Sequence, residues 1–299
     1  MGVAVFRNVI LSVVVVLVLA SCSTPDLQPA ERTVDVGTHT LHAVVHGSGT
    51  PVVVFDGGIG AFASEYALLQ ERLAAATTVV TYDRAGYGSS EAGPLPRDSS
   101  RVATELRVLL ERLGLTGPYV LVGHSLGGLN VEVFAAAYPE DVAAIVLLDP
   151  PPLGFISGDE YVELAAVASQ MTDEWQSIAD RGMESGDEQE RAEAEFFKTL
   201  ASEHREMFGA SAEKARSIET FGDARLVVVA SGVPNSRFGD VAEEYQEYWA
   251  AESEALAAKS SRGVFLFAES STHRLHDDEA ELVVETILGL VESLRLELH

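Results

Sequence analysis

Cysteine and basic side chains are scarce in this chain. Its 299 residues include one cysteine, so no disulfide can form within the chain. Lys and Arg number 20 against 46 Asp and Glu, which gives a formal net charge of -26 at pH 7. A chain this acidic is repelled by phosphate backbones, and we therefore expect no nucleic-acid partner. The charge favours solubility and identifies neither a partner nor a substrate.

The sequence also lacks a pattern typical of a metal site. His39, His42 and His46 are spaced loosely along the first expected strands, and we interpret them as strand or turn residues rather than ligands. No group of His, Asp and Glu shows the spacing of a metal site. We expect neither a metal nor another cofactor.

The apolar run near the N-terminus is too short to span a membrane comfortably. Arg7 precedes it, and Val9 to Ala20 are almost wholly apolar. The run ends in Leu19-Ala20-Ser21-Cys22, which resembles the bacterial lipobox, whose cysteine is lipidated and becomes the new N-terminus. The pattern predicts a signal peptide over 1–22, lipidation at Cys22 and a tether over 23–32. We therefore expect an exported protein, anchored by its lipid to a bacterial membrane.

Strand and helix patterns alternate along the rest of the chain. Short apolar runs such as Pro51–Phe55 and Val142–Leu148 are typical of buried parallel strands. A helix is expected over Ser99–Leu113, with Ser99 or Ser100 as its cap. The alternation predicts an α/β fold, in which a mostly parallel sheet is flanked by helices. Other expected elements are strands at Val34–Val36, His39–Val45, Thr77–Tyr82, Tyr119–Val122, Leu226–Ala230 and Val264–Phe267, and helices at Phe62–Ala75, Glu243–Ala258 and Glu279–Leu294.

One stretch interrupts this alternation. Between Pro150 and about Gly222 there is no strand pattern, and acidic amphipathic helices are expected at Asp159–Arg181 and Asp187–Met207. So long an insertion between two core strands predicts a helical cap over the carboxyl ends of the strands. The expected domains are therefore a core over 33–149 and 223–299 and a cap over 150–222.

The sequence Gly123-His124-Ser125-Leu126-Gly127 follows the apolar run Tyr119–Val122 directly. It has the form G-x-S-x-G at a strand-to-helix junction, where a sharp turn exposes the serine hydroxyl. Gly123 and Gly127 lack a Cβ, so the strand and the helix can approach closely. We predict that Ser125 is a nucleophile and that the backbone N–H of Leu126 faces a developing oxyanion.

These patterns together resemble the α/β-hydrolase family over nearly all of Thr33–Leu294. Asp56-Gly57-Gly58-Ile59-Gly60 is similar to the family's H-G-G-x-G loop, and residues 83–90 are similar to its D-R-x-G-x-G-x-S turn. Ser271-Thr272-His273, after the last strand, is similar to the loop that carries the catalytic histidine. The resemblance implies the α/β-hydrolase fold with a serine nucleophile and the order Ser…Asp…His.

A serine hydroxyl is a poor nucleophile until a base takes its proton, and imidazole suits that task near neutral pH. We predict that His273 is this base. His276 is the rival, and its alternative role is that of an exposed loop histidine. His124, inside the elbow, is interpreted as structural, with its side chain pointing away from the pocket.

The resemblance places the acid of the triad after the strand Leu226–Ala230 or after Val142–Leu148. The first loop contains Asn235 where an Asp is expected, and an amide cannot supply the charge that stabilises an imidazolium. Asp149, at the end of the second strand, is therefore the predicted acid. Asp240, further along the later loop, is the alternative.

The resemblance also indicates how an oxyanion would be bound. Leu126 supplies one backbone N–H, and Gly58 is the predicted second donor, with Ile59 as the alternative. Asp56 stands where the family often has His, and we expect it to point away from the oxyanion and hold the loop. Asp83 and Arg84 are expected to brace the next turn through an internal pair or backbone bonds.

The sequence therefore predicts a serine hydrolase acting on a small-molecule substrate. The bond cleaved would be an ester, thioester or amide of a small to medium apolar compound, with the acyl group passing through Ser125 to water. The glycine loop also resembles that of aminopeptidase-like members. The alternative function is a non-catalytic, ligand-binding lipoprotein that keeps the fold.

The lipobox yields a direct prediction. Cys22→Ala should abolish lipidation and leave the hydrolase domain active, because the tether lies outside the predicted core. Metabolic labelling with a clickable fatty acid measures this. Fatty-acid incorporation that persists in the variant would rule out Cys22 as the anchor.

Overall fold

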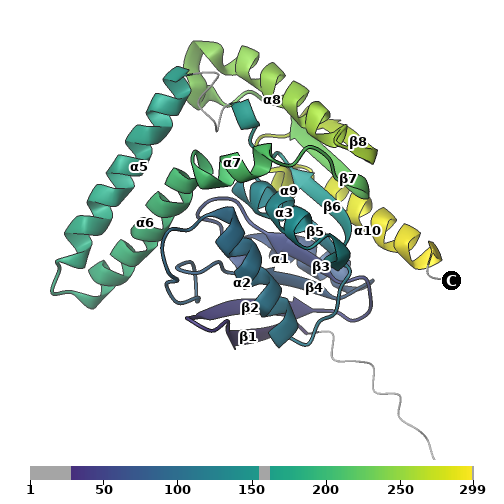
Figure 1. The fold of residues 1–299 in the computed structure, drawn as a ribbon, viewed down its shortest axis with the longest axis horizontal. Helices are drawn as coiled ribbons and strands as arrows, with labels where there is room; N and C mark the ends of the chain where they lie inside the picture. The colour runs from purple at the N-terminus through teal and green to yellow at the C-terminus, as the bar shows by residue number, and fades with distance from the viewer. Residues whose placement is uncertain (1–27, 155–161, 298–299) are drawn as a thin grey trace, which may run out of the picture.

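The computed structural model describes residues 28–154 and 162–297 (Figure 1). Cys22, the first half of the expected tether and the start of the helix expected from Asp159 lie outside the described residues. Within those two ranges, no helix combines the length and the apolar character that a membrane span needs.

Eight strands form one sheet in the order β1-β2-β4-β3-β5-β6-β7-β8. β2 pairs antiparallel with β1 and with β4, and every other neighbouring pair is parallel. The predicted fold class is thus confirmed. The strands are β1 (Ala30–Asp35), β2 (Thr40–His46), β3 (Val53–Asp56), β4 (Val79–Tyr82), β5 (Tyr119–His124), β6 (Val142–Leu148), β7 (Gly222–Ser231) and β8 (Ser260–Ala268).

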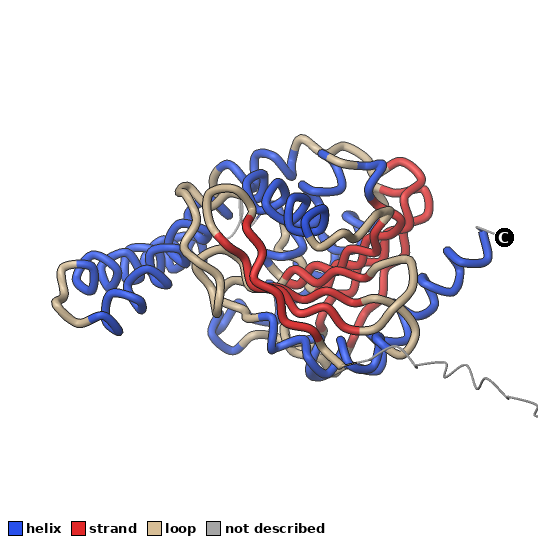
Figure 2. The backbone as a smooth tube through the Cα atoms, turned by 90° about the horizontal axis from the view of Figure 1, so that it is seen from below, coloured by secondary structure: helices blue, strands red, loops and turns tan. Residues whose placement is uncertain are grey.

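Helices cover both faces of the sheet (Figure 2). The central strands are apolar along their whole length because both of their faces are buried. One face packs against α2 (Ser99–Arg112), α3 (Leu126–Ala137) and the end of α8 (Ala242–Ala257). The other packs against α1 (Ala67–Ala74) and α10 (Ala280–Glu297). Short helical turns are η1 (Ala63–Tyr66), η2 (Pro139–Asp141), η3 (Ser236–Val241) and α9 (Leu275–Asp278).

Two boundaries differ from the sequence prediction. The cap of α2 is Asp98, whose carboxylate accepts a hydrogen bond from the Arg101 N–H, so Ser99 and Ser100 belong to the first turn. β1 begins at Ala30, inside the range expected to be a tether, because Ala30 pairs with Val45 across the first hairpin.

Between β6 and β7, the described residues of the stretch expected to be a cap lie mostly in the helices α5 (Val162–Met183), α6 (Glu188–Met207) and α7 (Ala210–Arg216). α5 and α6 extend from the core as an antiparallel arm (Figure 1). They approach closely where Gly182 faces Ala194, since a Cβ on this glycine would lie 2.7 Å from the Ala194 Cβ. α6 from Phe196 onward and α7 contact the sheet-bearing core, with the Phe196 ring against Phe62 and Tyr87.

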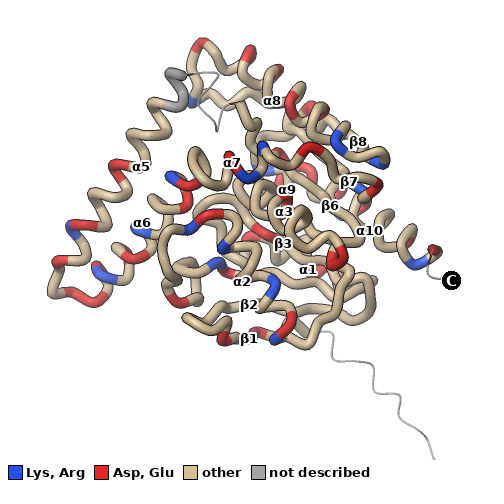
Figure 3. Tube along the Cα trace, in the orientation of Figure 1, with Lys and Arg blue, Asp and Glu red and all other residues tan. Residues whose placement is uncertain are grey.

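Acidic residues are spread over the helices and loops rather than gathered in one patch (Figure 3). The inserted helices carry acids on the arm and on its tip, and α8 carries further acids along its length. This distribution agrees with the interpretation that the net charge favours solubility.

Glu132 of α3 is an exception, because its side chain lies in the core. It is 2% exposed, and its Oε2 has no hydrogen-bond partner within the described ranges. Burial raises the pKa of this carboxyl from 4.5 to about 7, partly offset by the charge of Lys259. Between these two pH values the unfolded chain has lost the proton that the folded protein still holds. The contribution of Glu132 to stability therefore falls as pH rises through this window.

Glu132→Gln should remove this pH dependence. The free energy of unfolding of the variant minus that of wild type should be about 3 kcal/mol larger at pH 8 than at pH 4.5. Each unit of pKa shift corresponds to about 1.4 kcal/mol. Urea unfolding at both pH values measures this. Equal pH dependence in the two proteins would show that Glu132 ionises normally in the fold.

Candidate active site

Ser125 occupies the turn between β5 and α3. Its φ is 53°, a left-handed value that is unusual for a residue with a Cβ. The turn depends on glycines at both sides: a Cβ on Gly123 would lie 2.4 Å from the Gly127 oxygen, and one on Gly127 would lie 2.1 Å from the Asp56 oxygen. The Ser125 N–H donates to Leu148 of β6, and its side chain is half-buried. The sequence pattern thus forms the strained strand-to-helix turn.

Asp149 ends β6 with a φ of 49° and is 2% exposed. Its Oδ2 lies 2.6 Å from His273 Nδ1, a short, charge-assisted contact. The Ser231 N–H and hydroxyl donate to the same carboxylate at 2.8 and 2.9 Å. Because a carboxylate only accepts hydrogen bonds, His273 carries a proton on Nδ1, and the lone pair of the neutral ring lies on Nε2.

The two other candidates for the acid position do not contact His273. Asp240 lies exposed in η3 and forms no hydrogen bond to that ring. The Asn235 side chain caps η3, with its oxygen accepting from the Arg237 N–H at 3.1 Å. Of the three candidates, the structure brings only Asp149 together with His273.

His273 is fixed from two further sides. Its backbone oxygen accepts a 2.8 Å hydrogen bond from His124 Nε2, and its ring meets Trp249 edge-on with centroids 5.7 Å apart. His124 Nδ1 lies 3.3 Å from the Tyr66 hydroxyl. Burial lowers the pKa of His124 well below its usual value, so this ring is neutral and donates through Nε2. His124 therefore supports the loop of His273, as a structural role requires.

His276 is buried, and the expectation of an exposed loop histidine is wrong. Its ring packs on Tyr66 and His124 with centroids 4.9 and 4.7 Å away, and its pKa is lowered by burial. The chain enters α9 almost directly after His273. This turn places His276 against Tyr66 and His124 rather than beside Asp149.

The loop after β3 lies against the elbow. A Cβ placed on Gly58 would be 3.4 Å from Ser125 Cβ. Of the N–H groups proposed from the sequence, those of Leu126 and Ile59 donate to no atom of the described chain. The Gly58 N–H faces the Tyr66 hydroxyl, whose pKa is raised by burial and partly lowered by this amide. Leu126 therefore lies beside Ser125 with a backbone N–H that has no acceptor among the described residues. Gly58 and Ile59 remain the two candidates for the second oxyanion donor.

Asp56 points away from the elbow, as expected. Its carboxylate, 1% exposed, accepts from the Tyr82 hydroxyl at 2.6 Å and from Arg84 Nη1 at 2.8 Å. Burial raises its pKa, and the Arg84 charge opposes that rise. Of the two alternatives expected for Asp83 and Arg84, the structure has the backbone bonds and not the internal pair: Asp83 accepts from the N–H groups of Ala63 and Ser89, and Arg84 donates to the Gly57 and Gly58 oxygens. Their side-chain partners are His42 for Asp83, and Asp56 and Glu203 for Arg84.

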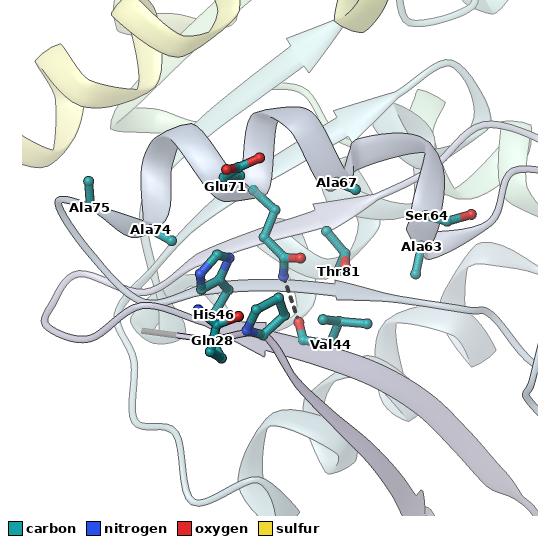
Figure 4. A pocket seen from close by; sticks show the side chains of 12 residues that line it. Gln28, Val44, His46, Ala63, Ser64, Ala67, Glu71, Ala74, Ala75 and Thr81 are labelled. Carbon is teal, nitrogen blue, oxygen red and sulfur yellow. Dashed lines mark hydrogen bonds between the residues drawn. The ribbon is translucent and has the colours of Figure 1, made fainter. Parts of the chain in front are cut away.

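A cavity of about 320 Å³ opens beside His273 and Asp149. α5, α6, η3 and α8 contribute its other walls. Its apolar lining is Ile59, Val167, Ala168, Met171, Val233, Phe238 and Trp249, and its polar lining includes His204, Ser231, Asn235, Arg237 and Gln246. The largest cavity described, about 620 Å³, lies between α1 and strands β2 and β4 (Figure 4). Neither Ser125 nor His273 lines it.

Several of these lining residues have no sequence signal. Trp249 has the pattern of an ordinary member of an amphipathic helix, and His204 that of a basic residue in the last turn of α6. Glu203, which lies outside the cavity lining and binds Arg84, has no sequence signal either. His204 lines the cavity with its Nδ1 2.6 Å from Thr172 Oγ1, and burial lowers its pKa to about 4. No trio of His, Cys, Asp or Glu within 28–154 and 162–297 is arranged to hold a metal ion.

Comparisons with known proteins agree with the observed fold. Residues 44–286 match the model of the alpha/beta hydrolase family. The uncharacterized protein YqjL of Bacillus subtilis (strain 168) is 27% identical over 245 residues, which cover 82% of this chain and 84% of YqjL. A thermophilic esterase from Thermogutta terrifontis has a TM-score of 0.62 and 19% identity, covering 89% of this chain and 99% of the esterase. The epoxide hydrolase CorEH has the same TM-score, with 17% identity, covering 89% of this chain and all of CorEH.

The acid position can be tested by removing one charge at a time. Asp149→Asn should lower kcat at least a hundredfold, because the amide cannot stabilise a protonated His273, and a comparable change in a serine protease costs about ten-thousand-fold. Asp240→Asn, the matched control, should change kcat less than twofold. Steady-state kinetics on a p-nitrophenyl ester measures both. The reverse order of effects would place the acid in the loop after β7.

Proposed function

Because the chain belongs to the alpha/beta hydrolase family, we propose that it is a serine hydrolase. It cleaves an ester, thioester or amide of a small to medium apolar compound through an acyl-enzyme on Ser125. Likeness to an esterase and to an epoxide hydrolase below 25% identity shows the fold alone, so the choice of chemistry rests on this chain's own residues.

The observation that carries the proposal is the 2.6 Å contact between Asp149 and His273. It leaves His273 Nε2 as the acceptor, in a loop that His124 ties to the elbow through a 2.8 Å hydrogen bond. A serine on a strained turn, a base with a free lone pair and a buried carboxylate behind it form the arrangement that acyl transfer needs.

The reaction follows from these positions. Ser125 Oγ attacks the substrate carbonyl while its proton moves to His273 Nε2, and Asp149 stabilises the resulting imidazolium. The leaving group takes that proton as the tetrahedral intermediate collapses to the acyl-enzyme. Water, deprotonated by the same Nε2, then releases the acid and restores Ser125.

Backbone donors bind the negative oxygen in both tetrahedral steps. Leu126 begins α3, so its N–H has no partner within the helix. The second donor is the backbone N–H of either Gly58 or Ile59, whose loop lies against Ser125. Fixed donors of this kind are worth about 10²- to 10³-fold in kcat each.

The nucleophile distinguishes this chemistry from that of epoxide hydrolases. Hydrolysis of epoxides in this fold uses a carboxylate nucleophile, whereas the elbow here carries a serine hydroxyl. The predominantly apolar cavity of about 320 Å³ suits an apolar acyl chain. We therefore favour an acyl compound as substrate.

We also propose that the enzyme acts outside the cytoplasm, held to a bacterial membrane by a lipid on Cys22. The support is the lipobox-like Leu19-Ala20-Ser21-Cys22 after the apolar run. β1 begins at Ala30, eight residues after this cysteine, so a lipid there would leave the hydrolase core at the membrane surface.

Ser125→Ala should remove nearly all turnover and leave the fold intact, because the nucleophile is lost while the elbow geometry remains. Loss of a triad nucleophile can cost about a million-fold. Ser64→Ala is the matched control, since Ser64 lines the larger cavity of Figure 4 and should change the rate less than twofold. Hydrolysis of a panel of p-nitrophenyl esters measures both variants. Activity of Ser125→Ala within tenfold of wild type would contradict the proposal and favour a binding protein.

A further inference from the structure

We propose that the inserted helix α6 completes the oxyanion site: Glu203 holds Arg84, and Arg84 holds the glycine loop so that the backbone N–H of Ile59 is aimed at the elbow. Glu203 and Arg84 are positioning residues, because neither touches the reacting atoms. The inference rests on the proposed serine-hydrolase function and assigns a catalytic task to the insertion.

Arg84 is buried, and all of its donors are engaged. The side chains of Arg84 and Glu203 are each 2% exposed. Nε and Nη2 donate to the two carboxylate oxygens of Glu203 at 2.9 and 3.0 Å, a bidentate pair. The remaining donors reach Asp56 Oδ1 at 2.8 Å, the Gly57 oxygen at 2.6 Å and the Gly58 oxygen at 2.7 Å. Since a guanidinium has five N–H groups, none is left over.

Arg84 thereby fixes two successive peptide planes. The peptide bonds from Gly57 to Gly58 and from Gly58 to Ile59 are trans. In a trans peptide the N–H points opposite to the carbonyl of the same plane. Because both carbonyls point at Arg84, the N–H groups of Gly58 and Ile59 face away from it.

On the side opposite Arg84, the Gly58 N–H is directed at the Tyr66 hydroxyl, and the Ile59 N–H is left to face the elbow. The position of a Cβ on Gly58 is 3.4 Å from Ser125 Cβ, and Ile59 lines the cavity beside His273. The Gly58 oxygen also accepts from the Ala61 N–H at 3.2 Å, so without Arg84 this single bond would hold it, and the peptide could rotate and present its oxygen to the substrate instead. A carbonyl there would repel the developing oxyanion, so the guanidinium selects the productive orientation.

Glu203 is needed because Asp56 alone cannot fix the guanidinium. Asp56 contacts a single Arg84 nitrogen, whereas Glu203 binds two in one plane and sets the rotation of the group. The Tyr87 hydroxyl donates to Glu203 Oε2 at 2.7 Å and holds the carboxylate in turn. A guanidinium pulled only toward Asp56 would tilt away from the Gly58 oxygen.

This part of α6 is anchored to the core. The Arg97 N–H donates to the Ser202 hydroxyl at 3.0 Å, and a Cβ on Gly86 would meet Thr199 Oγ1 at 2.2 Å. Gly86 and Arg97, which both follow Arg84 in the chain, therefore pack against the part of α6 that carries Glu203. The insertion thus contacts the oxyanion loop through a rigid segment.

The test compares the effect of a substitution on kcat, which reports transition-state stabilisation, with its effect on KM, which reports substrate binding. Glu203→Gln keeps the shape but breaks the bidentate pair, so kcat should fall about 10- to 100-fold while KM changes less than twofold. Inhibition by an alkyl trifluoromethyl ketone, which forms an oxyanion on the serine, should weaken by the same factor as kcat/KM.

Glu105→Gln is the matched control. It breaks another buried bidentate pair, Arg97–Glu105 at 2.7 and 2.6 Å, which lies near α6 without touching the glycine loop. Its kcat and ketone affinity should stay within twofold of wild type, whatever stability it loses. An equal loss of kcat in both variants would show a general stability effect and overturn the inference.

Tyr87→Phe decides the question if Glu203→Gln does not fold. It removes one hydrogen bond to Glu203 and should lower kcat and ketone affinity together by roughly threefold, the scale of one bond. Unchanged values in the folded variants, with an active wild type, would overturn this inference alone. A wild type that neither hydrolyses esters nor binds the ketone would overturn the serine-hydrolase proposal and this inference with it.

Discussion

The hydrogen bond from His273 Nδ1 to Asp149 Oδ2 joins two segments that are 124 residues apart in the chain. Asp149 follows β6, the third strand from one edge of the sheet, and His273 follows β8, the strand at that edge. Their contact requires the carboxyl ends of the parallel strands to be in register, which the buried apolar strands provide. Without that register, the imidazole would lose both its orientation and the charge behind it.

Further buried hydrogen bonds hold this contact and the loops around the elbow in place. The Ser231 N–H and hydroxyl donate further hydrogen bonds to the Asp149 carboxylate. His124, inside the elbow, donates to the His273 backbone oxygen and fixes that loop. On the other side of Ser125, Arg84 holds the carbonyls of the glycine loop. The groups that would donate, accept and transfer protons are thus each fixed by a buried neighbour, which is the condition for preorganised catalysis.

The sequence predicted those parts of the molecule that local chemistry determines. The elbow needs glycines at Gly123 and Gly127, and parallel strands need apolar runs, so both leave a pattern. Asp149 could be proposed because the end of a strand fixes its place at the sheet edge. Glu203, Trp249 and the burial of His276 depend on how inserted and late helices pack, which no local spacing encodes. The pairing of Arg84 with Glu203 instead of Asp83 has the same cause.

The central claim is that Ser125 is a nucleophile activated by His273. Reaction of the purified protein with a fluorophosphonate, followed by intact-mass measurement and peptide mapping, tests it most directly. The account predicts one adduct per chain, located on Ser125 and lost when the protein is denatured before the probe is added. No adduct, or an adduct on another residue with Ser125 unmodified, would contradict it.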